Sequence, residues 1–269
     1  MAFIEIDSMN IYYERKGTGN KQIVFVHGNS LSSKLFDKQF NDDKLLTNYE
    51  LIRFDLPGFG NSEYATDKYI YSFQGFAKVF KELYEQLNIT NAVLVGNSLG
   101  GHLILETIEN LKNVKGVLIS GTPPFAIPPA DNIFLPNPNV LLFFQEEHTT
   151  KELDALVNSM INDNKFTEQV KTEVLKSDGS FRNVWMTNFQ TFLPKDEIEI
   201  IKNLSIPVAV LHCKNEKLVN FEYLKTVQFN DLWKNEIRMV DDACHLPFLE
   251  QPEIYNSHLL NFCNSLYNN

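Results

Sequence analysis

Residues 93–102 read Val93-Leu94-Val95-Gly96-Asn97-Ser98-Leu99-Gly100-Gly101-His102, an apolar, β-branched run that ends in a Gly-x-Ser-x-Gly sequence. Helix-forming residues follow directly, so the serine lies at a sharp turn from a strand to a helix. Gly96 and Gly100 lack a Cβ atom, which lets the strand and the helix approach each other closely. Such a turn holds the serine above the edge of a sheet, usually in a strained backbone conformation. Ser98 is therefore a candidate nucleophile, and an ordinary glycine-flanked turn is the alternative.

The bulk composition is that of an acidic globular protein. The chain has 269 residues, a hydrophobic fraction of 43% and a formal net charge of −10, which fits one large α/β domain or one domain with an insertion. An acidic surface repels polyanions, so we expect neither nucleic acid nor an anionic membrane as a partner. The N-terminus has no leader-like pattern, and no apolar run approaches the roughly 18 residues that span a bilayer. Three cysteines without paired spacing indicate a reducing compartment, so we expect a cytoplasmic protein, with its oligomeric state left open.

Strand-like and helix-like segments alternate over most of the chain. Two short runs flank the turn residues Asp7-Ser8 and predict a β-hairpin. The continuously apolar run at 22–26 is typical of a strand buried on both faces of a sheet. Strands are predicted at 3–6, 10–14, 22–26, 49–54, 92–95, 116–121, 206–212 and 236–240, and helices at 31–40, 71–87, from Ser98 to about 110, at 221–229 and at 252–267. This order predicts a mostly parallel, eight-stranded sheet with helices on both faces.

The alternation stops between residues 123 and 195. This segment is rich in proline and contains no convincing strand. Helical patterns occur at 140–147, 153–162, 167–177 and 182–192. We therefore expect an inserted helical cap over the sheet at 123–195, with residues 1–122 and 196–269 forming the α/β core.

A nucleophilic serine needs a base to accept its proton and an acid to orient that base. In a parallel sheet these groups are expected in loops at the carboxyl ends of strands, where Ser98 also lies. Two loops qualify by position. The loop after the predicted strand 206–212 contains Glu216, and the loop after strand 236–240 contains Asp241, Asp242 and His245.

The chain resembles the α/β-hydrolase fold family over nearly its whole length. Several short motifs carry the resemblance, in the order in which the family has them. They are His27-Gly28 after the third strand, Asp55-Leu56-Pro57-Gly58-Phe59-Gly60-Asn61-Ser62 after the fourth, Gly96-Asn97-Ser98-Leu99-Gly100-Gly101 after the fifth, and His245-x-Pro-x-x-Glu-x-Pro-Glu at the last helix. The chain order serine, acid, histidine is also the family's.

This resemblance implies a role for each candidate. Ser98 is expected to be the nucleophile and His245 the general base and then the general acid. Glu216 occupies the acid position, where the family commonly has aspartate. The alternative for Glu216 is a solvated surface charge, with Asp241 and Asp242 as substitutes, although both are expected to cap the loop or face water.

The resemblance also implies an oxyanion hole made by the backbone N–H groups of Leu99 and Asn29. The Asn29 side chain is a further candidate for contact with the substrate. Ser30 stands where the family often has proline, which leaves open which N–H points inward. His27 is expected to orient the loop that carries Asn29, and His102 is expected to be buried on its helix rather than catalytic.

A serine nucleophile attacks acyl carbonyls, so the expected reaction is acyl transfer to water, with no cofactor and no metal ion. The expected substrate is a partly apolar acyl ester or lactone, bound by Ser30, Phe125, Trp185, Met186 and Phe189. Among such hydrolases the chain is similar to the metal-independent N-acyl homoserine lactonases, which act in quorum quenching. A generic carboxylesterase or thioesterase is the alternative, and a hydrolase-like protein that binds without turnover is a second one. The same fold hosts many chemistries.

Overall fold

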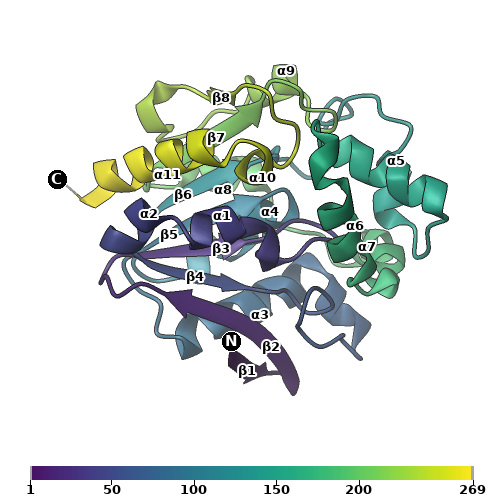
Figure 1. Cartoon of the computed structure of the whole chain (residues 1–269), viewed down its shortest axis with the longest axis horizontal. Coiled ribbons are helices and arrows are strands. Elements are labelled where there is room, and N and C mark those ends of the chain that lie inside the picture. The colour runs from purple at the N-terminus through teal and green to yellow at the C-terminus, as the bar shows by residue number, and fades with distance from the viewer. Residues whose placement is uncertain (1, 268–269) are drawn as a thin grey trace.

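The computed structural model describes residues 2–267, and its centre is one twisted sheet (Figure 1). Within these residues the sheet has eight strands in the order β1-β2-β4-β3-β5-β6-β7-β8. β1 and β2 pair antiparallel, as do β2 and β4, whereas all later pairs are parallel. The strands are β1 (Ala2–Ile6), β2 (Met9–Lys16), β3 (Gln22–Val26), β4 (Glu50–Phe54), β5 (Ala92–Asn97), β6 (Val114–Ser120), β7 (Val208–Cys213) and β8 (Arg238–Val240). The predicted mostly parallel sheet is confirmed.

The N-terminal hairpin follows from its turn residues. Ile6 pairs with Met9, and the two residues between them, Asp7 and Ser8, have φ values of 49° and 61°. Positive φ at both central residues matches the twist of a two-residue hairpin turn. The hairpin was expected from the sequence, and its second strand extends two residues beyond the prediction at its C-terminal end.

Helices cover both faces of the sheet because its central strands are apolar on both sides. All five residues of β3 are buried: Val24 and Val26 belong to one core, and Ile23 and Phe25 to the other. The first core contains residues of α3 (Phe73–Gln86), α4 (Leu99–Thr107), α8 (Glu197–Asn203) and α9 (Phe221–Leu224). The second contains residues of α1 (Asp37–Phe40), α2 (Asp43–Asn48), α10 (Pro247–Glu250) and α11 (Pro252–Tyr267).

Most predicted helices are present, with different lengths. Helix α3 begins after Ser72, whose hydroxyl caps the helix by accepting a hydrogen bond from the Gly75 N–H at 3.0 Å. The predicted helix at 31–40 is a 3₁₀ turn (Ser33–Phe36) followed by α1, and the one at 221–229 is only the four residues of α9. Helices α2, α8 and α10 were not predicted.

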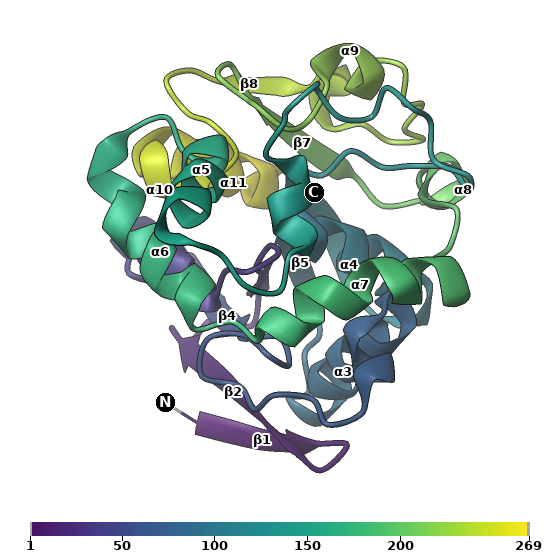
Figure 2. The same cartoon turned by 90° about the vertical axis from the view of Figure 1, so that its right-hand side faces the viewer.

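The segment at 123–195, which the sequence predicts to be an insertion and which is called the insertion below, contains α5 (Thr150–Met160), α6 (Thr167–Leu175) and α7 (Gly179–Thr191), together with 3₁₀ turns at Val140–Phe144 and Asn164–Phe166. These helices gather at one end of the sheet, on the right in Figure 1 and facing the viewer in Figure 2. Phe134 forms an isolated antiparallel bridge with Val219, which joins the insertion to the loop after β7. In residues 2–267, no helix is both long and apolar enough for a membrane span.

Candidate active site

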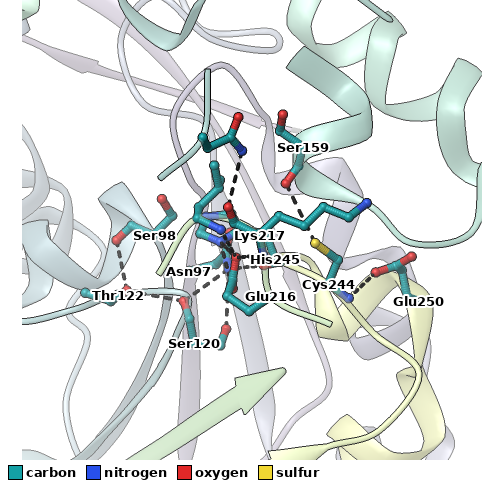
Figure 3. A network of polar contacts seen from close by, with 12 residues as sticks. Asn97, Ser98, Ser120, Thr122, Ser159, Glu216, Lys217, Cys244, His245 and Glu250 are labelled. Atoms are coloured by element: carbon teal, nitrogen blue, oxygen red, sulfur yellow. Dashed lines mark hydrogen bonds and ion pairs between the residues drawn. The ribbon is translucent and has the colours of Figure 1, made fainter. Parts of the chain in front are cut away.

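Ser98 lies in a strained turn between β5 and α4. Its backbone has φ 51° and ψ −121°, a region that residues other than glycine rarely adopt. The Ser98 N–H donates to the carbonyl of Ser120 at 2.9 Å, and the Thr122 hydroxyl donates to the Ser98 carbonyl at 2.9 Å (Figure 3). A Cβ atom on Gly100 would overlap the carbonyl of Val26, so only glycine fits where α4 crosses β3. The surrounding contacts therefore hold the strained serine in place.

His245 and Glu216 form a buried pair. Nδ1 of His245 lies 3.1 Å from both carboxylate oxygens of Glu216, and the side chains are only 5% and 3% exposed. The Glu216 carboxylate also accepts the N–H groups of Lys217 and Leu218, each at 3.0 Å. Burial alone would raise the pKa of Glu216, but the charge and hydrogen bond of His245, together with the Leu218 N–H, outweigh burial and lower it. Glu216 is therefore a buried carboxylate and not a solvated surface charge.

The loop that carries His245 is held by two buried polar side chains. Asn97, next to Ser98, donates from Nδ2 to the carbonyls of His245 at 3.0 Å and Ser120 at 3.1 Å. Glu250 accepts the Cys244 N–H at 2.6 Å, and its other oxygen accepts two N–H groups at the end of α5. Figure 3 shows Asn97 and Glu250 on opposite sides of this loop. The conformation of the His245 loop is thus tied both to the turn that carries Ser98 and to the residues that follow α5.

The two residues expected to supply the oxyanion donors, Leu99 and Asn29, line the same cavity as Ser98. Leu99 is the first residue of α4, and Asn29 follows the His27-Gly28 pair. Within residues 2–267 neither backbone N–H has an intramolecular acceptor, so both are free to bind an oxyanion. His27 accepts the Leu56 N–H at Nε2 and donates from Nδ1 to the Gly28 carbonyl, at 3.0 and 2.9 Å. Burial lowers the pKa of His27, which fits a neutral ring that shapes this loop.

Ser30 does not line the site, contrary to the expectation from the sequence. Its side chain is fully buried, and its hydroxyl donates to Oδ1 of Asn29 at 2.7 Å. The same hydroxyl accepts from Nη1 of Arg182 at 3.2 Å, a buried arginine of α7 that the sequence did not single out. Asn29 in turn donates from Nδ2 to the carbonyl of Phe143 at 3.3 Å. Ser30 is therefore not part of the cavity lining, and its hydroxyl instead supports the side-chain amide of Asn29, which does line the cavity.

Ser98 and His245 line the same cavity, of about 420 Å³. Its walls are mostly apolar, as is usual for small-molecule sites. The insertion supplies much of the lining, including Phe125, Trp185, Met186 and Phe189. No hydrogen bond joins the Ser98 hydroxyl to the His245 ring in the described chain, and such bonds often tighten only when substrate binds. A second depression, of about 660 Å³ and lined in part by Lys217, includes neither Ser98 nor His245.

The remaining candidates lie outside the reacting centre. Asp241 and Asp242 are exposed, and Asp241 pairs with Lys214 at 3.2 Å. No group of three or more histidine, cysteine, aspartate or glutamate side chains in residues 2–267 is arranged to hold a metal ion. His102 is buried on α4 as expected, but it also lines the cavity and binds Glu197, a residue that no sequence motif indicated.

The chain is similar to known proteins in sequence and in structure. The uncharacterised hydrolase YugF of Bacillus subtilis (strain 168) is 26% identical, over 96% of this chain and 95% of its own length. A mutant of the N-acyl homoserine lactonase AidH, complexed with N-hexanoyl homoserine lactone, is 27% identical with a TM-score of 0.93, covering 99% of this chain and 98% of that one. AidH complexed with N-butanoyl homoserine gives the same identity and coverage, with a TM-score of 0.90. The model of the alpha/beta hydrolase family matches residues 23–257, and this chain belongs to that family.

Proposed function

We propose that the protein is a serine hydrolase that opens the ring of N-acyl homoserine lactones through an acyl-enzyme on Ser98. The observation that carries the proposal is that Ser98, His245, Leu99 and Asn29 line one apolar cavity. A nucleophile, a base and oxyanion donors around one cavity are the parts that acyl transfer requires.

In the first half-reaction His245 takes the Ser98 proton at Nε2 while the serine oxygen attacks the lactone carbonyl carbon. Glu216 accepts the Nδ1 hydrogen, which fixes the ring tautomer and stabilises the imidazolium that forms. The N–H groups of Leu99 and Asn29 stabilise the oxyanion. When the tetrahedral intermediate collapses, the bond to the ring oxygen breaks and His245 protonates that oxygen. The acyl homoserine is then esterified to Ser98.

The second half-reaction uses the same groups in reverse order. His245 removes a proton from water, and the resulting hydroxide attacks the ester carbonyl. The bond to Ser98 breaks, and the serine recovers its proton from His245. The product is the ring-opened N-acyl homoserine, and Ser98 is free again.

The size and polarity of the cavity support a medium-length acyl chain. Phe125, Trp185, Met186 and Phe189 form an apolar wall, and burying each CH₂ group of a chain against such a wall contributes about 0.8 kcal/mol. The AidH complexes support the choice of leaving group, since the two ligands are a closed acyl homoserine lactone and a ring-opened acyl homoserine. We further propose that the insertion acts as a cap that selects the acyl chain and that the site needs no cofactor.

The test is a substrate panel of acyl homoserine lactones and p-nitrophenyl esters, measured with the wild type and with Ser98→Ala in the presence and absence of a chelator. We expect lactone turnover that survives chelation and is lost in the variant. Turnover of simple esters alone would replace the proposal with a general carboxylesterase. Failure of a fluorophosphonate to label Ser98 in the wild type would indicate a protein that binds without turnover.

A further inference from the structure

His102 is a polar group in the otherwise apolar part of the cavity. The polar side chains that line the cavity are Asn29, Ser98, His245 and His102, besides the indole of Trp185. His102 is only 8% exposed, and its ring lies 5.1 Å from that of Phe125 and 6.3 Å from that of Phe73, measured between centroids. The ring is therefore embedded among aromatic side chains of the wall.

The position of His102 follows from that of Ser98. The His102 N–H closes the first turn of α4 onto the Ser98 carbonyl, at 3.3 Å. The side chains of Ser98 and His102 line the same cavity, and four residues of helix rise by about 6 Å. An acyl chain whose carbonyl reaches Ser98 and whose tail follows the apolar wall therefore passes His102.

The other side of the ring is held by a buried carboxylate. Nδ1 of His102 lies 2.9 Å from both oxygens of Glu197, whose side chain is 1% exposed. Glu197 also accepts the Phe125 N–H at 3.2 Å and makes no ion pair with a lysine or arginine in the described structure. Nε2 of His102 makes no hydrogen bond within residues 2–267, which leaves this atom to a ligand.

The charge of the His102–Glu197 pair decides whether Nε2 of His102 is a hydrogen-bond donor or an acceptor. A negative charge buried without a cation is costly. Glu216 offsets this cost by accepting two backbone N–H groups at 3.0 Å, whereas Glu197, among the described residues, accepts only the Phe125 N–H at 3.2 Å besides His102, and burial raises the pKa of Glu197. The His102–Glu197 pair is therefore favoured in its net-neutral form. In that form one proton lies between Nδ1 and Glu197, and a second is on Nε2. This holds whether the shared proton belongs to the imidazole or to the carboxyl group. The Nε2–H group is thus a hydrogen-bond donor.

We propose that His102 is a specificity-determining residue whose Nε2–H binds an acceptor oxygen on the substrate's acyl chain, so that chains carrying a keto oxygen are preferred over unsubstituted ones. This inference rests on the proposed function for the identity of the substrate, and on the His102–Glu197 pair for the preference. A keto oxygen accepts a hydrogen bond without bringing a donor that would need its own partner. An unsubstituted chain covers the Nε2–H group without giving it an acceptor. The cost of leaving this donor unsatisfied is the larger part of the expected difference in affinity.

The test measures binding to the catalytically silent variant Ser98→Ala, so it does not depend on turnover. The probes are N-hexanoyl homoserine lactone and its 3-oxo and 5-oxo counterparts, with dissociation constants from calorimetry. We expect at least one keto probe to bind about tenfold more tightly than the unsubstituted one, and this ratio to fall to about one in Ser98→Ala/His102→Phe. The phenylalanine keeps an aromatic ring against Phe125 and removes only the polar atoms.

Two further measurements separate this role from simple packing. Met186→Leu alters another lining residue without changing its polarity, so the ratio between keto and unsubstituted probes should stay the same. The ¹⁵N resonance of His102 Nε2 should shift with the keto probe and not with the unsubstituted one. The proposal is overturned if His102→Phe keeps the ratio, or if no probe binds Ser98→Ala. Absence of lactone turnover by the wild type would instead count against the proposed function alone.

Discussion

Nδ1 of His245 lies 3.1 Å from each carboxylate oxygen of Glu216, and both side chains are almost completely buried. A carboxylate in this place accepts the Nδ1 hydrogen and leaves Nε2 free to act as a base toward Ser98. The proposed acyl transfer therefore depends on this contact between Glu216 and the ring of His245.

Glu216→Gln should lower kcat about a thousandfold while leaving the fold intact. The glutamine amide is able to donate to Nδ1, which favours the ring tautomer with its hydrogen on Nε2 and so removes the base. Steady-state rates on the best substrate of the panel, together with the rate of fluorophosphonate labelling, measure the effect. Asp241→Asn is the matched control, because it neutralises an exposed acid four residues before His245. Equal losses in the two variants would contradict the assignment of Glu216.

The same substitution should change how stability depends on acid. The pKa of Glu216 is lowered from its ordinary value of 4.5, so its ionised form stabilises the folded state. That contribution is complete above the unfolded value and is lost as the pH falls through the lower folded value. The free energy of unfolding of the wild type relative to Glu216→Gln should therefore be larger at about pH 6 than at about pH 3. Urea titrations at these pH values test the sign, and the opposite order would contradict it.

The convergence of these groups was predictable from the sequence because a parallel sheet brings the carboxyl ends of its strands to one edge. Asn29, Ser98, Glu216 and His245 follow β3, β5, β7 and β8, respectively. β3, β5 and β7 are short buried strands, whereas β8 is only the three residues Arg238–Val240 at the edge of the sheet. The alternation of strands and helices therefore placed the candidate loops at one edge of the sheet, and the resemblance to the α/β-hydrolase family selected Asn29, Glu216 and His245 within them.

The parts that were not predicted depend on tertiary contacts between polar side chains. Ser30 was expected at the ligand, but Arg182 from a distant helix holds its hydroxyl away from the cavity. Glu197 lies in α8, whose start is marked in the sequence by the N-cap Asp196 and by Glu199 three residues later. That signal identifies the helix, but it does not reveal that the carboxylate of Glu197 meets His102.

Ser30→Ala should reduce kcat/KM about tenfold with little change in thermal stability. The substitution removes the hydrogen bond at 2.7 Å from Ser30 to Asn29, so the side-chain amide of Asn29 keeps only its longer bond, at 3.3 Å, to the Phe143 carbonyl and is less well fixed at the cavity wall. Ser177→Ala is the matched control, because the Ser177 hydroxyl accepts from the same Arg182 Nη1 at 2.7 Å and does not contact Asn29. Similar kinetic losses in both variants would mean that the position of Arg182, and not the orientation of Asn29, is what matters.

Glu250→Ala should destabilise the protein by about 3 kcal/mol and also lower kcat. The carboxylate accepts three backbone N–H groups, from Cys244 at 2.6 Å and from Asn162 and Asp163 at 2.6 and 2.7 Å, and the alanine leaves them without partners. Because these bonds join the loop of His245 to the end of α5, their loss should loosen the base and the insertion together. Urea unfolding and hydrogen exchange of these amides measure the two effects. Glu253→Ala, at an exposed position three residues further on, should leave both the stability and the exchange rates nearly unchanged, and a loss as large as that of Glu250→Ala would contradict the role assigned to Glu250.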